Sequence, residues 1–199
     1  QLHVVPVVAE VLALHPKLDV RLLLVDRVVS LADEGVDVAV RIGALPDSSL
    51  RARLVGTVRT VVAASPAYLA KHGVPKVPDD VSSAKHACIS FTGTTPVVDR
   101  WSFPTYPGGA RDRSVSVRPR LVVNTGQAAL DAAVDGVGLV RLLSYQVRHA
   151  VAHKTLRIVL DEFEPIASPV SLVHAPGFVS RATSVFLDVA TARLKSALT

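Results

Sequence analysis

The stretch VDRVVSLADEGVDVAVRIG, residues 25–43, decides the fold. Asp26 is a good N-cap and Gly35 suits the position just after a helix, so we expect a short helix over 28–34. Residues 36–42 follow and are nearly all apolar, as in a parallel strand that is covered on both faces. A helix, a glycine stop and a buried strand are the units of an α/β sheet.

The same stretch contains three candidate binding residues. In an open α/β sheet, ligands bind at the carboxyl ends of the parallel strands. Asp26, Arg41 and Gly43 are expected at that edge, where Arg41 could pair bidentately with an anion. The alternative is structural: Asp26 only caps the helix, and Arg41 only solvates the end of the strand. The spacing leaves both interpretations open.

The rest of the chain repeats this alternation of helices and strands. Helices are expected at 2–14, 67–71, 127–134, 144–152 and 179–198. Strands are expected at 18–25, 50–55, 57–64, 87–91, 114–117, 120–123, 139–142, 156–160 and 170–173. Residues 92–109, rich in Thr, Pro and Gly, are expected to form a loop or hairpin. The βαβ order of these elements implies parallel strands joined by right-handed crossovers.

The composition indicates a folded protein. With 199 residues, 49% apolar and 20% charged, the chain can bury the core of one domain or two small ones. The single cysteine, Cys88, excludes an internal disulfide and fits a reducing cytoplasm. It lies in the apolar run HACISF, so we expect an inert core residue. His3, Pro6 and Glu10 interrupt the apolar segment 2–14, which favours an amphipathic helix over a membrane span or signal sequence.

The net charge of +5 and the pI near 9.7 raise the question of nucleic-acid binding. The basic residues are scattered, however, and the densest group consists of Arg111, Arg113, Arg118 and Arg120. No aromatic platform or recognition-helix pattern accompanies this group. We interpret it as the solvated face of a hairpin, and expect no direct DNA contact by this chain.

Patterns typical of catalytic and cofactor sites are missing from the sequence. There is no hydrolase nucleophile elbow, phosphate-binding loop, dinucleotide fingerprint or zinc-protease motif. His149 and His153 lie four residues apart on a polar helix without a third ligand nearby, and are expected to face solvent. The sequence therefore predicts neither an enzyme nor a metal or cofactor site.

A binding function has better support. Asn124 and Thr125 precede the helix at 127–134, where unpaired backbone N–H groups and the positive end of the helix dipole suit a carboxylate. The alternative is that these two residues only cap the helix.

Five pieces of the sequence carry a family resemblance. They are DRVVSLADEGVDVAVRIGALPDSSLRARLVGTVRTVVAASPAYLAKHGVP (26–75), HACISF (86–91), WSF (101–103), VRPRLVVNTGQAALDAAVDGVGLVRLLSYQV (117–147) and the final helix after VSLVHAP (170–176). Their order and spacing resemble the effector-sensing domain of LysR-type bacterial transcription regulators, from residue 2 to the end. The resemblance implies two subdomains like those of type II periplasmic binding proteins, each a mostly parallel sheet flanked by helices. Two crossover strands would join subdomain I, residues 1–62 and 171–199, to subdomain II, residues 65–168.

The same resemblance implies a function. A small, anionic effector would bind in the cleft between the subdomains and shift their orientation, which controls DNA binding and transcription. The residues carried over to that site are Asp26, Arg41, Ile42, Gly43, Ser65, Thr92, Gly93, Asn124, Thr125 and Tyr145. Leu143 departs from the family, which has proline there, and this difference alters one wall of the expected cleft.

The resemblance also implies partners. DNA would be contacted only through a helix-turn-helix domain that, like the family's first strand, precedes the position of Gln1, so a fragment is expected. The full-length protein would be a cytoplasmic homodimer or tetramer in which the helix at 2–14 packs against the helix at 127–134 of a second protomer. The first alternative is a free-standing solute-binding protein of a transporter, and the second is an enzyme built on the same fold.

Overall fold

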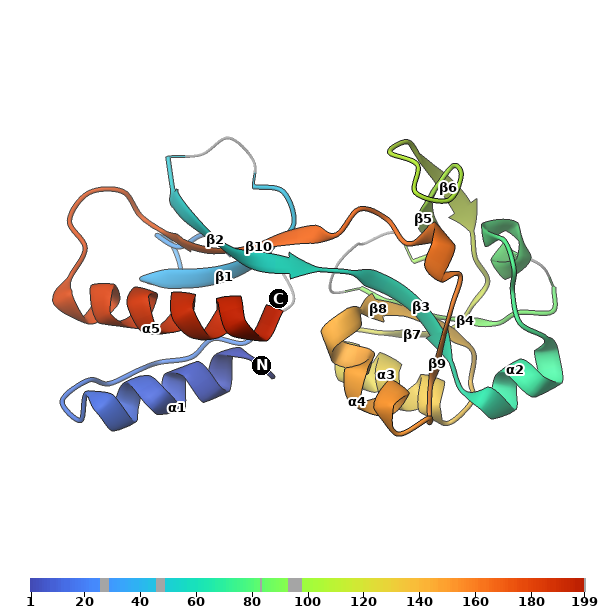
Figure 1. Cartoon of the computed structure of the whole chain (residues 1–199), viewed down its shortest axis with the longest axis horizontal. Helices are drawn as coiled ribbons and strands as arrows, with labels where there is room; N and C mark the ends of the chain where they lie inside the picture. The colour runs from blue at the N-terminus through green and yellow to red at the C-terminus, as the bar shows by residue number, and fades with distance from the viewer. Residues whose placement is uncertain (26–28, 46–48, 83, 93–97, 199) are drawn as a thin grey trace. The chain divides into compact units, whose positions relative to one another are not determined.

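The computed structural model describes residues 1–25, 29–45, 49–82, 84–92 and 98–198. The chain forms two compact units, each with helices flanking a main sheet (Figure 1). Unit 1 contains Gln1–Val58 and Ser168–Thr199, and unit 2 contains Arg59–Ala167. The expected α/β fold class is confirmed.

The chain passes between the units after Val58 and again after Ala167. The family resemblance implies these passages near 62–65 and 168–172. The first lies earlier because β3, Thr60–Ala64, pairs with two strands of unit 2 along most of its length.

The sheet of unit 1 has three strands in the order β1-β10-β2. They are β1 (Val38–Ile42), β10 (Ser168–His174) and β2 (Arg51–Val58). Both pairings are antiparallel, so β1 and β2 run in the same direction on either side of β10. The parallel pairing that the βαβ order implies therefore does not occur among the described strands of this unit. A strand from the far end of the chain lies between β1 and β2, and local periodicity does not report its direction.

Two helices, α1 (Val4–Leu14) and α5 (Arg181–Leu198), pack against one another, and α5 also packs on β2 (Figure 1). Glu10 of α1 and Arg193 of α5 form an ion pair between them. The buried residues of the two helices are apolar: Val7, Val11, Leu187, Ala190 and Leu194. The last helix thus belongs to the first unit.

The strand expected at 18–25 does not form. This segment has no regular secondary structure, and Leu22, Leu23 and Leu24 expose 39–50% of their surface. A strand needs a neighbour for its backbone hydrogen bonds, and none of the described strands pairs with this segment.

The helix expected at 28–34 is reduced to a turn at 31–35. The N–H of Val36 donates to the carbonyl oxygen of Leu31 at 2.8 Å, and Gly35 has a left-handed φ of +61°. A helix this short is marginal without packing, so the glycine closes a single turn.

The main sheet of unit 2 has five strands in the order β7-β4-β8-β3-β9. Besides β3, they are β7 (Pro119–Val123), β4 (Cys88–Phe91), β8 (Leu139–Leu143) and β9 (Arg157–Val159). β7, β4 and β8 are parallel, whereas β3 is antiparallel to both β8 and β9. The expected parallel pairing thus holds for three strands, whose carboxyl ends share one edge of the sheet.

Helices cover one face of this sheet, and a hairpin with shorter helices covers the other (Figure 1). The first face carries α3 (Gly126–Val134) and α4 (Ser144–Ala152). The second carries α2 (Pro66–His72), the 3-10 turn η1 (Pro78–Ser82) and the hairpin of β5 (Arg100–Pro104) and β6 (Asp112–Ser116); a second 3-10 turn, η2 (Asp161–Phe163), follows β9. Val61 and Ala63 of β3 face the helical core, and Val62 and Ala64 face the hairpin core. None of the helices in the described ranges is long and apolar enough to span a membrane.

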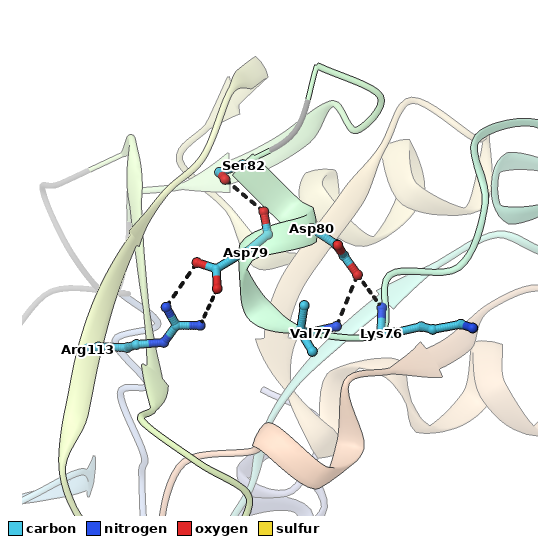
Figure 2. A network of polar contacts seen from close by, with 6 residues as sticks. All are labelled: Lys76, Val77, Asp79, Asp80, Ser82 and Arg113. Atoms are coloured by element: carbon cyan, nitrogen blue, oxygen red, sulfur yellow. Dashed lines mark hydrogen bonds and ion pairs between the residues drawn. The ribbon is translucent and has the colours of Figure 1, made fainter.

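A bidentate ion pair ties the hairpin to η1 (Figure 2). Both terminal nitrogens of Arg113 donate to the carboxylate of Asp79, at 2.9 and 2.8 Å. The other members of the densest basic group, Arg111, Arg118 and Arg120, are exposed. The group is therefore mainly solvated, as its pattern predicts, except that Arg113 is half-buried.

Candidate functional site

The three parallel strands of unit 2 end at one edge of their sheet. β7 is followed by Asn124, β4 by Thr92 and β8 by Ser144. The backbone N–H and the hydroxyl of Thr92 both donate to the carbonyl oxygen of Val123, at 3.0 and 3.3 Å, and so join two of the strand ends. Since ligands of α/β proteins bind at such edges, this edge is the candidate binding site of unit 2.

The helix α3 begins at this edge. Thr125 is its N-cap, and the Thr125 hydroxyl oxygen accepts the backbone N–H of Ala128 at 3.3 Å. The first N–H groups of a helix have no partner within it, and they carry the positive end of its dipole. Asn124 and Thr125 are exposed beside them. Capping by Thr125 is therefore present, and it is compatible with anion binding at the same helix start.

A second helix, α4, begins at the same edge. The N–H of Leu143 donates to the side-chain oxygen of Gln146 at 2.9 Å, and the N–H of Ser144 donates to the carbonyl oxygen of Arg59 at 2.8 Å. A Cβ at Gly126 would lie 2.4 Å from the amide nitrogen of Gln146. The absence of a side chain at Gly126 thus allows the two helix starts to approach closely, and both contribute positive potential there.

The structure brings four predicted site residues to this edge: Thr92, Asn124, Thr125 and the half-buried Tyr145. Ser65 does not share it. This residue follows β3, which runs opposite to β8, and therefore lies at the other edge of the sheet. Ser65 is 4% exposed, and its hydroxyl oxygen caps α2 by accepting a backbone N–H at 3.3 Å.

The predicted site residues of unit 1 lie at the end of β1. A terminal nitrogen of Arg41 donates to the carbonyl oxygen of Val29 at 2.7 Å, so this half-buried side chain has an internal partner. Gly43 has a φ of +106°, where other L-residues would be strained, and Ile42 is 42% exposed. The remaining predicted residues, Asp26 and Gly93, lie outside the described part of the chain.

Two charged groups of unit 2 lie outside the set of residues predicted from the sequence. Arg141 lies in the middle of β8, with its guanidinium carbon 5.8 Å from the centre of the Phe103 ring, and burial lowers its pKa. Its signal is visible in LVRLL, residues 139–143, where an arginine interrupts an apolar strand. Arg59 forms an ion pair with Glu164 in which one terminal nitrogen donates to both carboxylate oxygens, at 2.9 and 3.1 Å. No local pattern predicts a contact between residues so far apart in sequence.

Potential metal ligands and the single cysteine were the remaining candidates for chemistry in the described residues. No three His, Cys, Asp or Glu side chains there lie close enough to hold a metal ion. Cys88 is fully buried, and burial raises the pKa of its thiol to about 12, so the reactive thiolate is suppressed. The rings of His149 and His153 stack at 4.0 Å on an exposed helix face. The expectation of an inert Cys88 is confirmed.

The sequence matches the family model of the LysR substrate binding domain over residues 1–195. The chain belongs to this family. Its fold resembles that of the CrgA regulatory domain from Neisseria meningitidis, with a TM-score of 0.78 and 27% identity, covering 100% of this chain and 93% of that one. The regulatory domain of AphB in Vibrio vulnificus has the same fold, with a TM-score of 0.77, 21% identity and coverages of 94% and 90%.

Curated relatives carry names of transcription regulators. The chain is 34% identical over 154 residues to "Probable HTH-type transcriptional regulator LtrA" of Klebsiella pneumoniae, covering 77% of this chain and 48% of that protein. It is 32% identical over 175 residues to the regulator YhjC of Escherichia coli, covering 85% and 55%. The chain thus spans about half the length of these relatives.

Proposed function

We propose that this chain is the effector-sensing domain of a LysR-type transcription factor, which binds a small molecule and thereby controls DNA binding and transcription. The observation that carries the proposal is the family match over residues 1–195, and the names of the relatives support it. A free-standing solute-binding protein is not favoured, because these relatives are named as regulators. The domain is proposed to bind its ligand without converting it.

The effector would act through differential affinity. A ligand that binds one conformation more tightly shifts the population toward that conformation, by no more than the difference in binding free energy. DNA would be contacted through a helix-turn-helix domain, which the relatives' names state for those proteins. The cytoplasm is the proposed compartment, where such a regulator reaches DNA.

A small anion is the proposed effector class. The starts of α3 and α4 lie together at the edge of unit 2, and the positive ends of helices favour negative charge. Thr92, Asn124 and Thr125 would offer polar contacts beside these helix starts, and Tyr145 would add a phenol. This proposal concerns unit 2 and needs no contribution from the residues of unit 1.

For unit 1, effector binding by Arg41, Ile42 and Gly43 stays a proposal. Arg41 would exchange its 2.7 Å hydrogen bond to Val29 for a bond to the anion. Replacing Arg41 by Ala should then weaken an anionic effector by about 1.5–3 kcal/mol, the scale of a hydrogen bond to a charged group. Titration calorimetry measures this change, and an unchanged affinity would mean that Arg41 only anchors the segment before the turn at 31–35, through the carbonyl oxygen of Val29.

We also propose that the chain forms a homodimer, and a dimer or tetramer in the full-length protein. The helix α1 and the residues beside it expose several apolar side chains, Leu2 61%, Val5 42%, Leu12 38% and Leu14 59%, of which Val5 and Leu12 share one face of the helix. Exposed apolar surface of this kind is typical of protein contacts. The outer face of α3 on a second protomer is the proposed partner surface, so a two-fold arrangement would use each contact twice.

The regulatory role is tested with the full-length natural protein. A thermal-shift screen of small acids against this domain identifies ligands, because a ligand present at 100 times its Kd adds about 2.7 kcal/mol of stability. The affinity of the full-length protein for its operator DNA is then measured by fluorescence anisotropy with and without each acid. We expect an acid that stabilises the domain to change the DNA affinity. Stabilisation without any effect on DNA binding or transcription would contradict the regulatory role.

A further inference from the structure

Arg141 is a charged residue in a strand that is otherwise apolar. Its neighbours in β8, Val140 and Leu142, are 0% and 2% exposed. Within the described residues its guanidinium makes no hydrogen bond and no ion pair, and the charge of Asp112 favours the cation only through space. Arg141 is half-buried, and a partly desolvated cation without a hydrogen-bonded protein partner is less favourable than an apolar side chain at this position. Packing alone therefore does not account for an arginine here.

The sheet face that carries Arg141 opens toward the candidate site. Along β8, Leu139 is fully buried whereas Leu143 is half-buried. On the neighbouring strand β3, Val62, which pairs with Arg141, is 4% exposed, whereas Thr60, which pairs with Leu143, is half-buried. Arg141 thus lies where the hairpin core gives way to solvent, close to the edge at which β8 ends and α4 begins.

The surroundings of Arg141 suit a carboxylate. A guanidinium presents a planar fork of N–H donors that matches a carboxylate bidentately. The Phe103 ring lies 5.8 Å from the guanidinium carbon and limits the orientations of that fork. The hydroxyl of Thr60 is carried on the same face and can donate a further hydrogen bond.

We infer that Arg141 binds the carboxylate of the effector, with the hydroxyl of Thr60 as a second contact, and so selects carboxylic acids over their neutral analogues. This inference rests on the proposed effector-sensing function and names the residue that determines its ligand class. The competing role is purely structural: Arg141 would hold the β5–β6 hairpin on the sheet through Phe103.

The test compares carboxylates with their amides on this domain. The probes are acetate, succinate and benzoate, each against acetamide, succinamide or benzamide at equal ionic strength. We expect at least one carboxylate to bind, its amide to bind at least about tenfold more weakly, and the Nε–Hε signal of Arg141 to shift in NMR spectra. If no carboxylate binds better than its amide, the inference is overturned.

Substitutions separate recognition from packing. Arg141→Met should lower the affinity for that carboxylate at least about tenfold. Arg141→Lys should retain part of the wild-type affinity, because lysine keeps the positive charge but lacks the planar fork of N–H donors. Arg120→Met, on the exposed side of β7, is the matched control and should bind as the wild type does. Without ligand, Arg141→Met should melt no lower than the wild type. A lower melting temperature with unchanged carboxylate affinity would show that Arg141 only packs the hairpin.

The full-length protein distinguishes failure of this inference from failure of the proposed function. If wild type and Arg141→Met respond equally to the carboxylate in operator binding, Arg141 does not select the ligand, while effector sensing stands. If the wild type responds to none of the acids that bind the domain, the proposed function itself falls.

Discussion

The side chain of His86 is 4% exposed, and its Nδ1 lies 3.4 Å from the hydroxyl oxygen of Tyr68. Burial lowers the pKa of His86 most strongly, and the positive charge of His72 lowers it further. Asp80 acts in the opposite direction, and Lys85 adds a smaller lowering. The folded protein therefore keeps this imidazole neutral at pH values where an unfolded histidine takes up a proton.

Acid should destabilise the protein through His86. Because the pKa of His86 is lowered in the folded protein, its contribution to the free energy of unfolding is constant above the ordinary pKa of 6.5. Below that pH the contribution is progressively lost, because the histidine of the unfolded chain binds a proton first. His86→Gln should remove that part of the acid loss, whereas His153→Gln, at an exposed position, should keep it. Urea unfolding near pH 7.5 and near pH 5 measures the difference. Equal acid losses in both variants would contradict this account.

Glu164 is a second titrating group; its side chain is 12% exposed and forms an ion pair with Arg59. Burial raises the pKa of Glu164, and Arg59 offsets part of this rise. Arg59→Met should lower the free energy of unfolding by about 1–3 kcal/mol near neutral pH, because a buried carboxylate loses its partner. The loss should shrink on acidification, as Glu164 is protonated, and Glu164→Gln in the same background should recover most of it. A full loss that persists in the double variant would contradict this reading.

Elements that depend on local signals agree with the sequence. Ser65 and Gly73 bound α2, Thr125 caps α3, and α4 has the expected bounds of 144–152. Elements that depend on neighbouring strands differ from the sequence prediction. The segment 18–25 is apolar enough for a strand but pairs with none of the described strands.

The candidate site was predictable to the same extent. Thr92, Asn124 and Thr125 meet because each follows a parallel strand of unit 2. Ser65 lies at the opposite edge because β3 is antiparallel, and strand direction leaves no trace in periodicity. The hydrogen bond from Arg41 to the carbonyl oxygen of Val29 could not be predicted either, because it depends on how the segment before β1 folds back on that strand.

The contact between the starts of α3 and α4 can be measured as a coupling. Gly126→Ala should be destabilising by about 1 kcal/mol, because the new Cβ, 2.4 Å from the Gln146 amide nitrogen, displaces a side chain that accepts the N–H of Leu143. In a Gln146→Ala background the same change should cost less, since no side chain is displaced. Urea unfolding of the four proteins gives the coupling energy. Additive effects would mean that the two helix starts are independent.

Association is tested at Val5 and Leu12, the exposed apolar residues on one face of α1. Val5→Glu and Leu12→Glu, at positions 42% and 38% exposed, should dissociate a dimer while leaving the fold intact. Val11→Glu, at a position with no exposed surface, is the contrasting variant and should unfold the protein. Sedimentation velocity with circular dichroism separates the two effects. An unchanged dimer in both exposed variants would exclude α1 from the contact.

The central claim is that an acidic effector binds at the edge of unit 2 where β7, β4 and β8 end. The most direct test is an NMR titration of the labelled domain with the acid that stabilises it most in the thermal-shift screen. The account predicts that the backbone amide signals of Thr92, Asn124, Thr125, Ser144 and Tyr145 shift together and saturate with a single dissociation constant. Saturable shifts confined to other surfaces, with these five signals unchanged, would contradict it.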